Sequence, residues 1–219
     1  MRSKFVEQLS QLDNSLIEMG EMVEQAIANA DKALIERDTE LAQKIIASDN
    51  EIDDKEKEIE SLCLKLILLQ HPVAGDLKLV SAALKMITDL ERIGDHASDI
   101  SELTLLLAKT PYFEKMDIIS QMADATMKMV QDSIRAFVRK DLVLANEVIA
   151  YDDVVDNLFT KAKNELLELF NNSANMNGDH IIDLIMVAKY FERIGDHATN
   201  VAEWVIFSLT GVHKDQKIM

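Results

Sequence analysis

Apolar residues near the start of the chain recur at helical spacing. Their steps alternate between four and three residues at Phe5, Leu9, Leu12, Leu16, Met19, Val23, Ala26, Ala30 and Ala33. Residues at these steps share one face of an α-helix, and the alternation is typical of the seam of a helical bundle. The pattern predicts a first helix that runs to about Glu36.

A seven-residue repeat predicts a second helix. Its apolar positions are Ile45, Ile52, Ile59 and Leu66. Asp38 is a suitable N-cap, because its carboxylate can accept hydrogen bonds from free amides of the first turn. His71-Pro72 ends the helix, since the residue before proline is biased away from the helical region. A third helix is expected from about Ala74 to Ala108.

The periodicity restarts after Thr110-Pro111-Tyr112, which we predict to be the boundary between two units, residues 1–110 and 111–219. Three more helices are expected, roughly Asp117 to Arg139, Asp141 (an N-cap) to Phe170 and Asp179 to Leu209, with a polar loop Asn171–Gly178 and Gly211 as the final stop. Helices of about 30 residues with short connections pack as antiparallel bundles. The expected fold is all-α, with two tandem three-helix bundles of six long antiparallel helices.

An internal repeat supports this division. The hexapeptide Glu91-Arg92-Ile93-Gly94-Asp95-His96 reappears 101 residues later as Glu192-Arg193-Ile194-Gly195-Asp196-His197. Upstream, seven residues match seven others at an offset of 103: Asp38, Leu41, Ala42, Ile46, Ala47, Asp49 and Asp53 correspond to Asp141, Leu144, Ala145, Ile149, Ala150, Asp152 and Asp156. The chain therefore contains two copies of one unit of about 100 residues.

Composition narrows the class of protein. Only 2 Pro and 6 Gly in 219 residues favour long helices. A formal net charge of −16 argues against nucleic acid and anionic membranes as partners. A single cysteine, Cys63, excludes an intrachain disulfide, and no apolar run suits a signal peptide or a span of about 20 residues. We expect a cytoplasmic protein without membrane insertion.

Two rows of acidic residues are the candidate chemistry. The first acidic row is Glu91, Asp95, Asp99 and Glu102, and the second acidic row is Glu192, Asp196, Asn200 and Glu203. Both have the spacing 4, 4, 3, which places each row on one helix face. The preceding helix adds a pair to each row, Asp49 with Asp53 and Asp152 with Asp156. Such oxygen ligands suit hard cations, including Mg²⁺, Mn²⁺, Ca²⁺ and Fe³⁺.

Other interpretations of the acidic rows remain open. Acidic residues at helical spacing can form a solvated face, or an ion network with Arg92 and Arg193. Gly94 and Gly195 interrupt their helices and indicate close approach of another group, which tight helix packing explains as well as a metal site does. His96 and His197 lie about 100° around the helix from the carboxylates and are less suited as ligands.

The two repeats, Leu90–Ala97 and Phe191–Asn200, resemble the signature of the PhoU family, the accessory and regulatory proteins of bacterial phosphate-specific transport, and Pro72–Lys78 resembles the segment entering its third helix. The resemblance implies two tandem three-helix bundles, often dimeric, that bind iron, zinc, manganese or magnesium through Glu or Asp followed four residues later by Asp. The implied metal residues are Asp49, Asp53, Glu91, Asp95, Asp99, Asp152, Asp156, Glu192, Asp196 and Asn200. Asn200 replaces a carboxylate, which weakens the second site.

The function that the resemblance implies is a restraint on the phosphate-specific ABC transporter together with signalling of phosphate sufficiency. The implied partners are the ATPase subunit of the transporter and a membrane sensor histidine kinase, and a homodimer is expected. We expect no catalytic residues. One alternative is a carboxylate-bridged metal enzyme of the ferritin-like type, which requires Glu-x-x-His motifs that this sequence lacks. The other is a metal-free helical scaffold.

Overall fold

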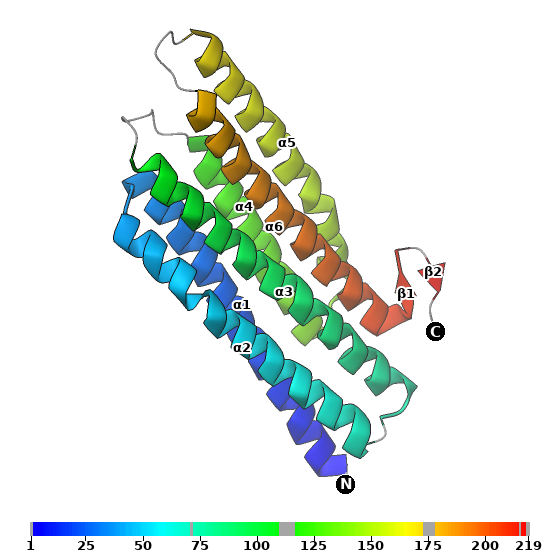
Figure 1. Ribbon diagram of the computed structural model, residues 1–219. Helices are drawn as coiled ribbons and strands as arrows, with labels where there is room; N and C mark the ends of the chain where they lie inside the picture. Colours follow the sequence, from blue (N-terminus) through cyan, green and yellow to red (C-terminus); the bar gives the residue numbers. More distant parts are fainter. Residues whose placement is uncertain (1, 71, 110–116, 173–177, 215, 218–219) are drawn as a thin grey trace.

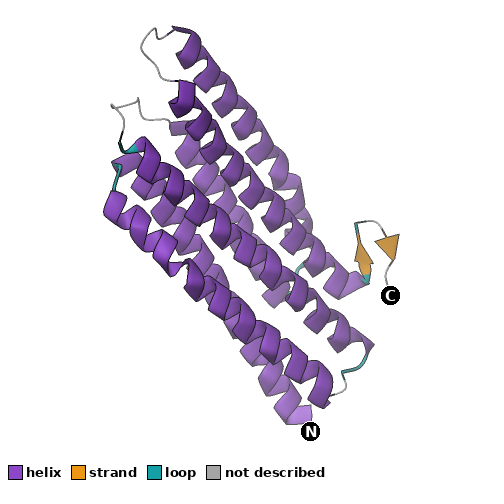
Figure 2. Cartoon of the chain, in the orientation of Figure 1, coloured by secondary structure: helices purple, strands orange, loops and turns teal. Residues whose placement is uncertain are grey.

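Six long helices make up nearly all of the computed structural model, which describes residues 2–70, 72–109, 117–172, 178–214 and 216–217 (Figures 1 and 2). The helices are α1 (Arg2–Glu36), α2 (Thr39–Gln70), α3 (Ala74–Leu107), α4 (Asp117–Arg139), α5 (Leu142–Asn172) and α6 (Gly178–Thr210). This confirms the all-α fold and its six helices.

Equivalent aspartates begin α2 and α5. Oδ1 of Asp38 accepts hydrogen bonds from the amides of Glu40 at 3.0 Å and Leu41 at 2.9 Å. Oδ1 of Asp141 accepts from the amides two and three residues later, each at 3.0 Å. Both predicted N-caps are therefore confirmed. The residues before them, Arg37 and Lys140, each have φ 55°, the left-handed geometry that ends the preceding helix within a short turn.

The C-terminal end of α6 differs in one respect from the expectation. Gly211 has φ 81° and ends the helix as predicted. It is followed by two short antiparallel strands, β1 (Val212–His213) and β2 (Gln216–Lys217), which were not predicted. Strands of two residues carry too few alternating positions to produce a period-two pattern.

The six helices run roughly parallel to one long axis (Figure 1). α1, α2 and α3, the first half, contact one another, as do α4, α5 and α6, the second half. The halves meet along α3 and α6 and along α1 and α4. Buried side chains of both halves form one continuous core. The predicted boundary Thr110-Pro111-Tyr112 and most of the predicted loop Asn171–Gly178 lie outside the described residues, so the division at residue 110 stays a prediction.

The two predicted apolar stripes form much of the core of the first half. In α1, Leu12, Leu16, Met19 and Val23 are fully buried. In α2, Ile59 and Leu66 are fully buried, and Ile45 and Ile52 are at most 5% exposed. Burying one such side chain contributes about 1.5–3 kcal/mol, so these stripes are a main source of stability. Among the described residues, no helix combines the length and the apolar character needed to cross a membrane.

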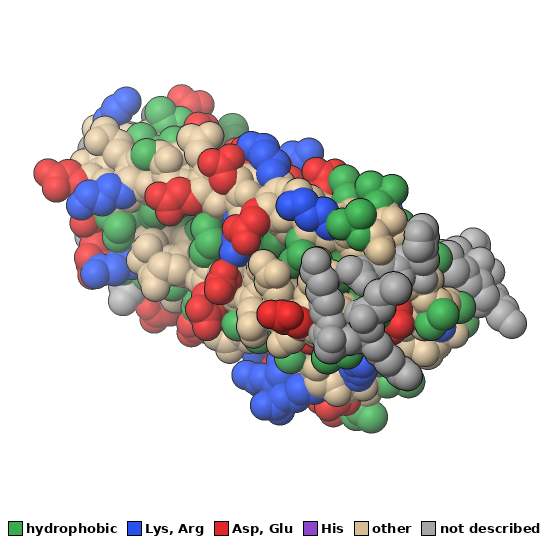
Figure 3. All heavy atoms as spheres, turned by 90° about the horizontal axis from the view of Figure 1, so that it is seen from below, with side chains coloured by type: hydrophobic (Ala, Val, Ile, Leu, Met, Phe, Trp, Pro, Cys, Tyr) green, Lys and Arg blue, Asp and Glu red, His purple; other side chains and the backbone are tan. Residues whose placement is uncertain are grey.

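Charged side chains are scattered over the outside of the bundle, among neutral and apolar ones (Figure 3). On the face that Figure 3 shows, acidic and basic side chains lie interspersed rather than in separate patches. The excess of negative charge is therefore not gathered on this face, and the acidic rows have to be located from their own contacts.

Candidate metal centre

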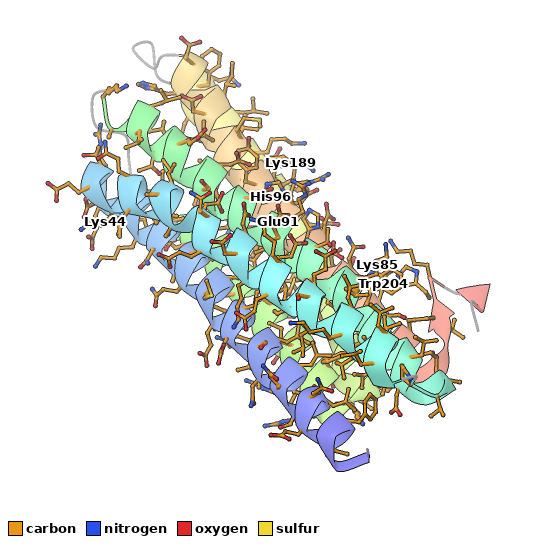
Figure 4. The ribbon with its side chains drawn as sticks, turned by 60° about the horizontal axis from the view of Figure 1, so that its bottom comes forward. Lys44, Lys85, Glu91, His96, Lys189 and Trp204 are labelled. Carbon is orange, nitrogen blue, oxygen red and sulfur yellow. The ribbon has the colours of Figure 1, made fainter. Side chains whose placement is uncertain are left out.

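Three carboxylates converge where α2 packs on α3. Asp53 of α2 and Glu91 and Asp95 of α3 each offer one oxygen, and these oxygens lie within 4.8 Å of one another. All three side chains are partly buried. Glu91 lies near the middle of α3, on the side next to α2 (Figure 4). The structure thus brings together residues from the first acidic row and from its neighbouring pair, as a metal site would require.

Gly94 makes this close approach possible. A Cβ at this position would lie 2.8 Å from Cδ1 of Ile52 and 3.6 Å from Oδ1 of Asp49. A contact of 2.8 Å is too short for two carbon atoms, so a larger residue would require the side chain of Ile52 to move or α2 to shift. The same glycine therefore allows the helices to pack and places the carboxylate of Asp49 against the backbone of α3.

Electrostatic repulsion is concentrated at Asp49. Its burial, followed by the charges of Asp95, Asp53 and Asp99, raises the pKa of this carboxyl to about 6. Burial and the charge of Asp95 also raise the pKa of Glu91, against the opposing effect of Arg92. A bound cation would favour the ionised form of these groups and remove this repulsion.

Two side chains of α3 already face the first acidic row. Nη1 of Arg92 lies 2.7 Å from Oδ2 of Asp95, and its Nε lies 3.4 Å from Oε2 of Glu91. Arg92 is more than half exposed, and exposed ion pairs contribute only about 0.2–1 kcal/mol. Nδ1 of His96 lies 3.2 Å from Oδ2 of Asp99. Part of the alternative ion network is therefore present. Its ion pairs between Arg92 and the carboxylates are weak, so a cation could displace the arginine.

The second half repeats the geometry at Gly195. A Cβ there would lie 3.2 Å from Cγ1 of Val155 and 3.3 Å from Oδ1 of Asp152. Burial, then the charges of Asp156 and Asp196, raise the pKa of Asp152 to about 6. Within the described residues, however, the only group of three converging carboxylates is that of the first half. Asp156 itself is exposed, whereas its counterpart Asp53 is partly buried.

Asn200 and Glu192 have partners within the chain. Nδ2 of Asn200 donates to Oδ1 of Asp89 at 3.1 Å, and its Oδ1 accepts from Nζ of Lys214 at 3.3 Å. Glu192 forms an ion pair with Lys189. The amide of Asn200 is thus directed to Asp89 and Lys214, and its role as a metal ligand stays a prediction.

The two histidines of the hexapeptides lie between the halves. Their ring centroids are 5.5 Å apart. His96 stacks on Tyr190 at 5.4 Å, and Nδ1 of His197 lies 2.9 Å from Oδ1 of Asp89. Burial lowers the pKa of His96. These contacts join α3 to α6, as Figure 4 illustrates at the label of His96.

Sequence reasoning missed Asp89, Tyr190, Lys189 and Lys214. The sequence held a signal for two of them, because Asp89 and Tyr190 occupy equivalent positions at the offset of 101. In the structure Asp89 contacts His197 and Tyr190 contacts His96. No periodicity could reveal that α3 and α6 face each other, since contacts between distant segments leave no local pattern.

The donor set fits a hard metal ion. Oxygen atoms of Asp53, Glu91 and Asp95, with Asp49 beside them, suit Mg²⁺, Mn²⁺ or Fe³⁺ better than a thiophilic metal. Cys63 is buried, and burial raises the pKa of its thiol to about 12, so it supplies no thiolate at neutral pH. The arrangement can therefore bind a cation and fix α2 against α3.

Comparisons with known proteins cover most of the chain. The family described as PhoU domain matches residues 16–104 and 119–205, one match in each half. A "phosphate-specific transport system accessory protein PhoU homolog" from Clostridium acetobutylicum is 38% identical over 215 residues, 98% of each chain. A protein of the same description from Aquifex aeolicus is 37% identical over 87% of this chain and 86% of its own.

Solved structures give the same result. The crystal structure of PhoU from Pseudomonas aeruginosa superposes with a TM-score of 0.87 at 32% identity, covering 95% of this chain and 100% of that one. The phosphate transport system regulatory protein PhoU from Streptococcus pneumoniae superposes with a TM-score of 0.89 at 25% identity, covering 97% and 100%. The similarity thus extends over both halves.

Proposed function

The chain belongs to the PhoU family, and on that basis we propose that it is a non-enzymatic accessory protein of phosphate-specific transport. The observation that carries the proposal is 38% identity over 98% of the chain with a relative that bears this description. In this role the protein restrains the phosphate ABC transporter when phosphate is plentiful and helps to signal that state to a sensor kinase.

The partners follow from the role. They are the ATPase subunit of the transporter and the membrane sensor histidine kinase, which the protein contacts in the cytoplasm, and the working form is a homodimer. Direct nucleic-acid binding does not fit the net charge of −16.

Metal ions on the acidic helix faces are the second element of the proposal. Its support is the convergence of Asp53, Glu91 and Asp95 and the raised pKa of Asp49. An ion here would be held by carboxylates of α2 and α3 at once, so binding would fix the relative position of these helices. The outer face of this pair would then be ordered for docking.

The function can be tested in cells. A deletion strain of the source organism grown in high phosphate should accumulate more intracellular phosphate and polyphosphate than its parent, and restoring the gene should reverse this. Unchanged phosphate levels in the deletion strain would contradict a restraint on uptake. Complementation with Asp53→Asn/Asp95→Asn separates the metal from the docking, because these variants keep the side-chain volume. We expect weaker restoration, whereas the surface variant Lys161→Gln should restore fully.

The metal-free scaffold is the competing hypothesis, which the ion pairs of Arg92 with Glu91 and Asp95 favour. Metal analysis separates the two. Protein purified without chelator and titrated with Mn²⁺ should bind it if the acidic rows are metal sites. Absence of binding to Mn²⁺ and Fe³⁺ would leave the accessory role intact and favour the scaffold.

A further inference from the structure

The two acidic rows differ in the cations that the chain itself supplies. Around the first acidic row, Arg92 pairs with Glu91 and Asp95, and His96 contacts Asp99. The second acidic row keeps Arg193 and His197 of the repeat and has two lysines in addition, one near each end. Lys189 pairs with Glu192, and Nζ of Lys214 lies 3.2 Å from Oε2 of Glu203.

Lys189 and Phe159 form a contact whose two residue types differ from those at the equivalent positions of the first half. Its Nζ lies 5.5 Å from the ring centroid of Phe159 on α5, within the range of a cation–π contact. The equivalent residues of the first half are Thr88 and Glu56, and the hydroxyl of Thr88 donates to Glu56 at 3.2 Å. The first half therefore has a carboxylate and a neutral side chain where the second half has a ring and an ammonium.

The replacement of Glu56 and Thr88 by Phe159 and Lys189 makes the surroundings of the second acidic row less negative. Glu56 places a negative charge near Glu91 of the first acidic row. At the level of Asp99, the second half has the neutral Asn200. The second half thus lacks the carboxylates of Glu56 and Asp99 and gains Lys189. Asp89 of α3 adds one carboxylate beside Asn200, so the field of the second row remains less negative and attracts an external cation less.

Lys214 reaches the second acidic row from the C-terminal hairpin, the segment containing β1 and β2. The hairpin is held on α6, because the ring of His213 stacks on Trp204 with centroids 3.9 Å apart. Lys214 has φ 47° in the turn, and its Nζ donates to Oδ1 of Asn200 at 3.3 Å. It lines a cavity of about 340 Å³ whose other walls include Arg193, Asp196, Thr199, Asn200 and Glu203. The side chain of Lys214 therefore covers the Asn200–Glu203 end of the second acidic row.

We propose that the first acidic row binds an external metal ion, whereas in the second acidic row the ammonium groups of Lys189 and Lys214 take the place of a metal ion as counter-charges. A metal ion entering the second row would meet Lys189 at Glu192, and an ion bound at Asn200 and Glu203 would require Lys214 to leave them. Lys214 thereby regulates access to the Asn200 end of the second row. This inference rests on the metal binding put forward under the proposed function.

Calorimetric titration of the chelator-treated full chain with MnCl₂ tests the proposal. The native sequence should bind one ion tightly, with any second ion at least about tenfold weaker, a difference of about 1.4 kcal/mol. Asp53→Asn/Asp95→Asn should abolish the tight event. Lys189→Gln/Lys214→Gln should leave the tight event unchanged and tighten the second about tenfold or more. Lys161→Gln, which removes another lysine of the second half, should change neither.

Each result has one meaning. No Mn²⁺ binding by the native protein overturns the metal part of the proposed function and this inference with it. Two equal events, or a second event that the double lysine variant leaves unchanged, overturn the inference alone. Lys214→Gln by itself guards against misfolding, because Lys214 is 57% exposed and should be replaceable without loss of the fold. Its second event should also tighten, by less than in the double variant.

Discussion

Asp89 of α3 and His197 of α6 join the two halves of the molecule, with Oδ1 of Asp89 2.9 Å from Nδ1 of His197. The same Oδ1 accepts a hydrogen bond from Asn200. At the equivalent place across the interface, Tyr190 stacks on His96. The repeat has thus diverged at one pair of positions, into a carboxylate that binds polar groups and a ring that stacks.

Replacing Asp89 should weaken the contact between the halves. Asp89→Ala removes the partner of two partly buried polar groups, and an unsatisfied group of this kind costs about 1–3 kcal/mol. We expect the free energy of unfolding in urea to fall by about 1–2 kcal/mol. Asp54→Ala is the control, because Asp54 is 79% exposed and should be replaceable without effect. Equal stability of the two variants would show that the contact contributes nothing.

Gly94 offers a test of the helix contact under the candidate metal centre. Gly94→Ala should destabilise the protein by about 1–2 kcal/mol, because overpacking outweighs the gain of about 1 kcal/mol in helix propensity. Shortening the opposing side chain by Ile52→Val removes Cδ1, the atom 2.8 Å from the added Cβ. The double variant should therefore be more stable than the sum of the two single changes predicts.

Gly75→Ala is the matched control for that experiment, since nothing lies within 4 Å of its added Cβ. It should leave the urea midpoint unchanged or raise it. A Gly94→Ala protein as stable as the Gly75→Ala protein would mean that α2 shifts freely, and the close approach would then not be required.

The raised pKa of Asp49 predicts a pH dependence of stability. The folded-state pKa is about 6, above the value of about 3.9 for an unfolded chain. The folded state therefore holds the proton more tightly, so its stabilising effect is full below about pH 4 and is lost as the pH rises through about 6. Because the site is partly exposed, we expect about 1 kcal/mol for this group.

Urea unfolding of chelator-treated protein at pH 4.5 and pH 7.5 measures this effect. Asp49→Asn should reduce the fall in stability over this interval, and Asp152→Asn should do the same in the second half, whose pKa is likewise raised to about 6. Asp54→Asn serves as the exposed control. Identical pH profiles for Asp49→Asn and the native protein would contradict the burial and repulsion inferred here.

The acidic rows should be dispensable for folding. Asp95→Ala with Asp196→Ala removes one carboxylate from each row, and both side chains are only partly buried. We expect metal content measured by mass spectrometry to fall by most of its value, while the free energy of unfolding of metal-free protein changes by less than about 1 kcal/mol. Loss of the cooperative transition would instead assign the rows a structural role.

The sequence by itself determined the helices, their ends and the repeat. Apolar periodicity and the caps Asp38 and Asp141 are local, because each depends on residues within one or two turns. The positions of Glu91 and Asp95 on one face follow from helix geometry alone. For the same reason the sequence could predict the two acidic rows but not which of their oxygens meet.

Only the tertiary structure decided how the rows differ. The approach of Asp53 to Glu91 depends on the packing of α2 at Gly94, and the contact of Asp89 with His197 depends on the packing of α3 on α6. Lys214 reaches Asn200 only because the hairpin folds back onto α6. Such contacts arise from the burial of whole helix faces and from the path of the chain between distant segments, and neither leaves a periodic trace in the sequence.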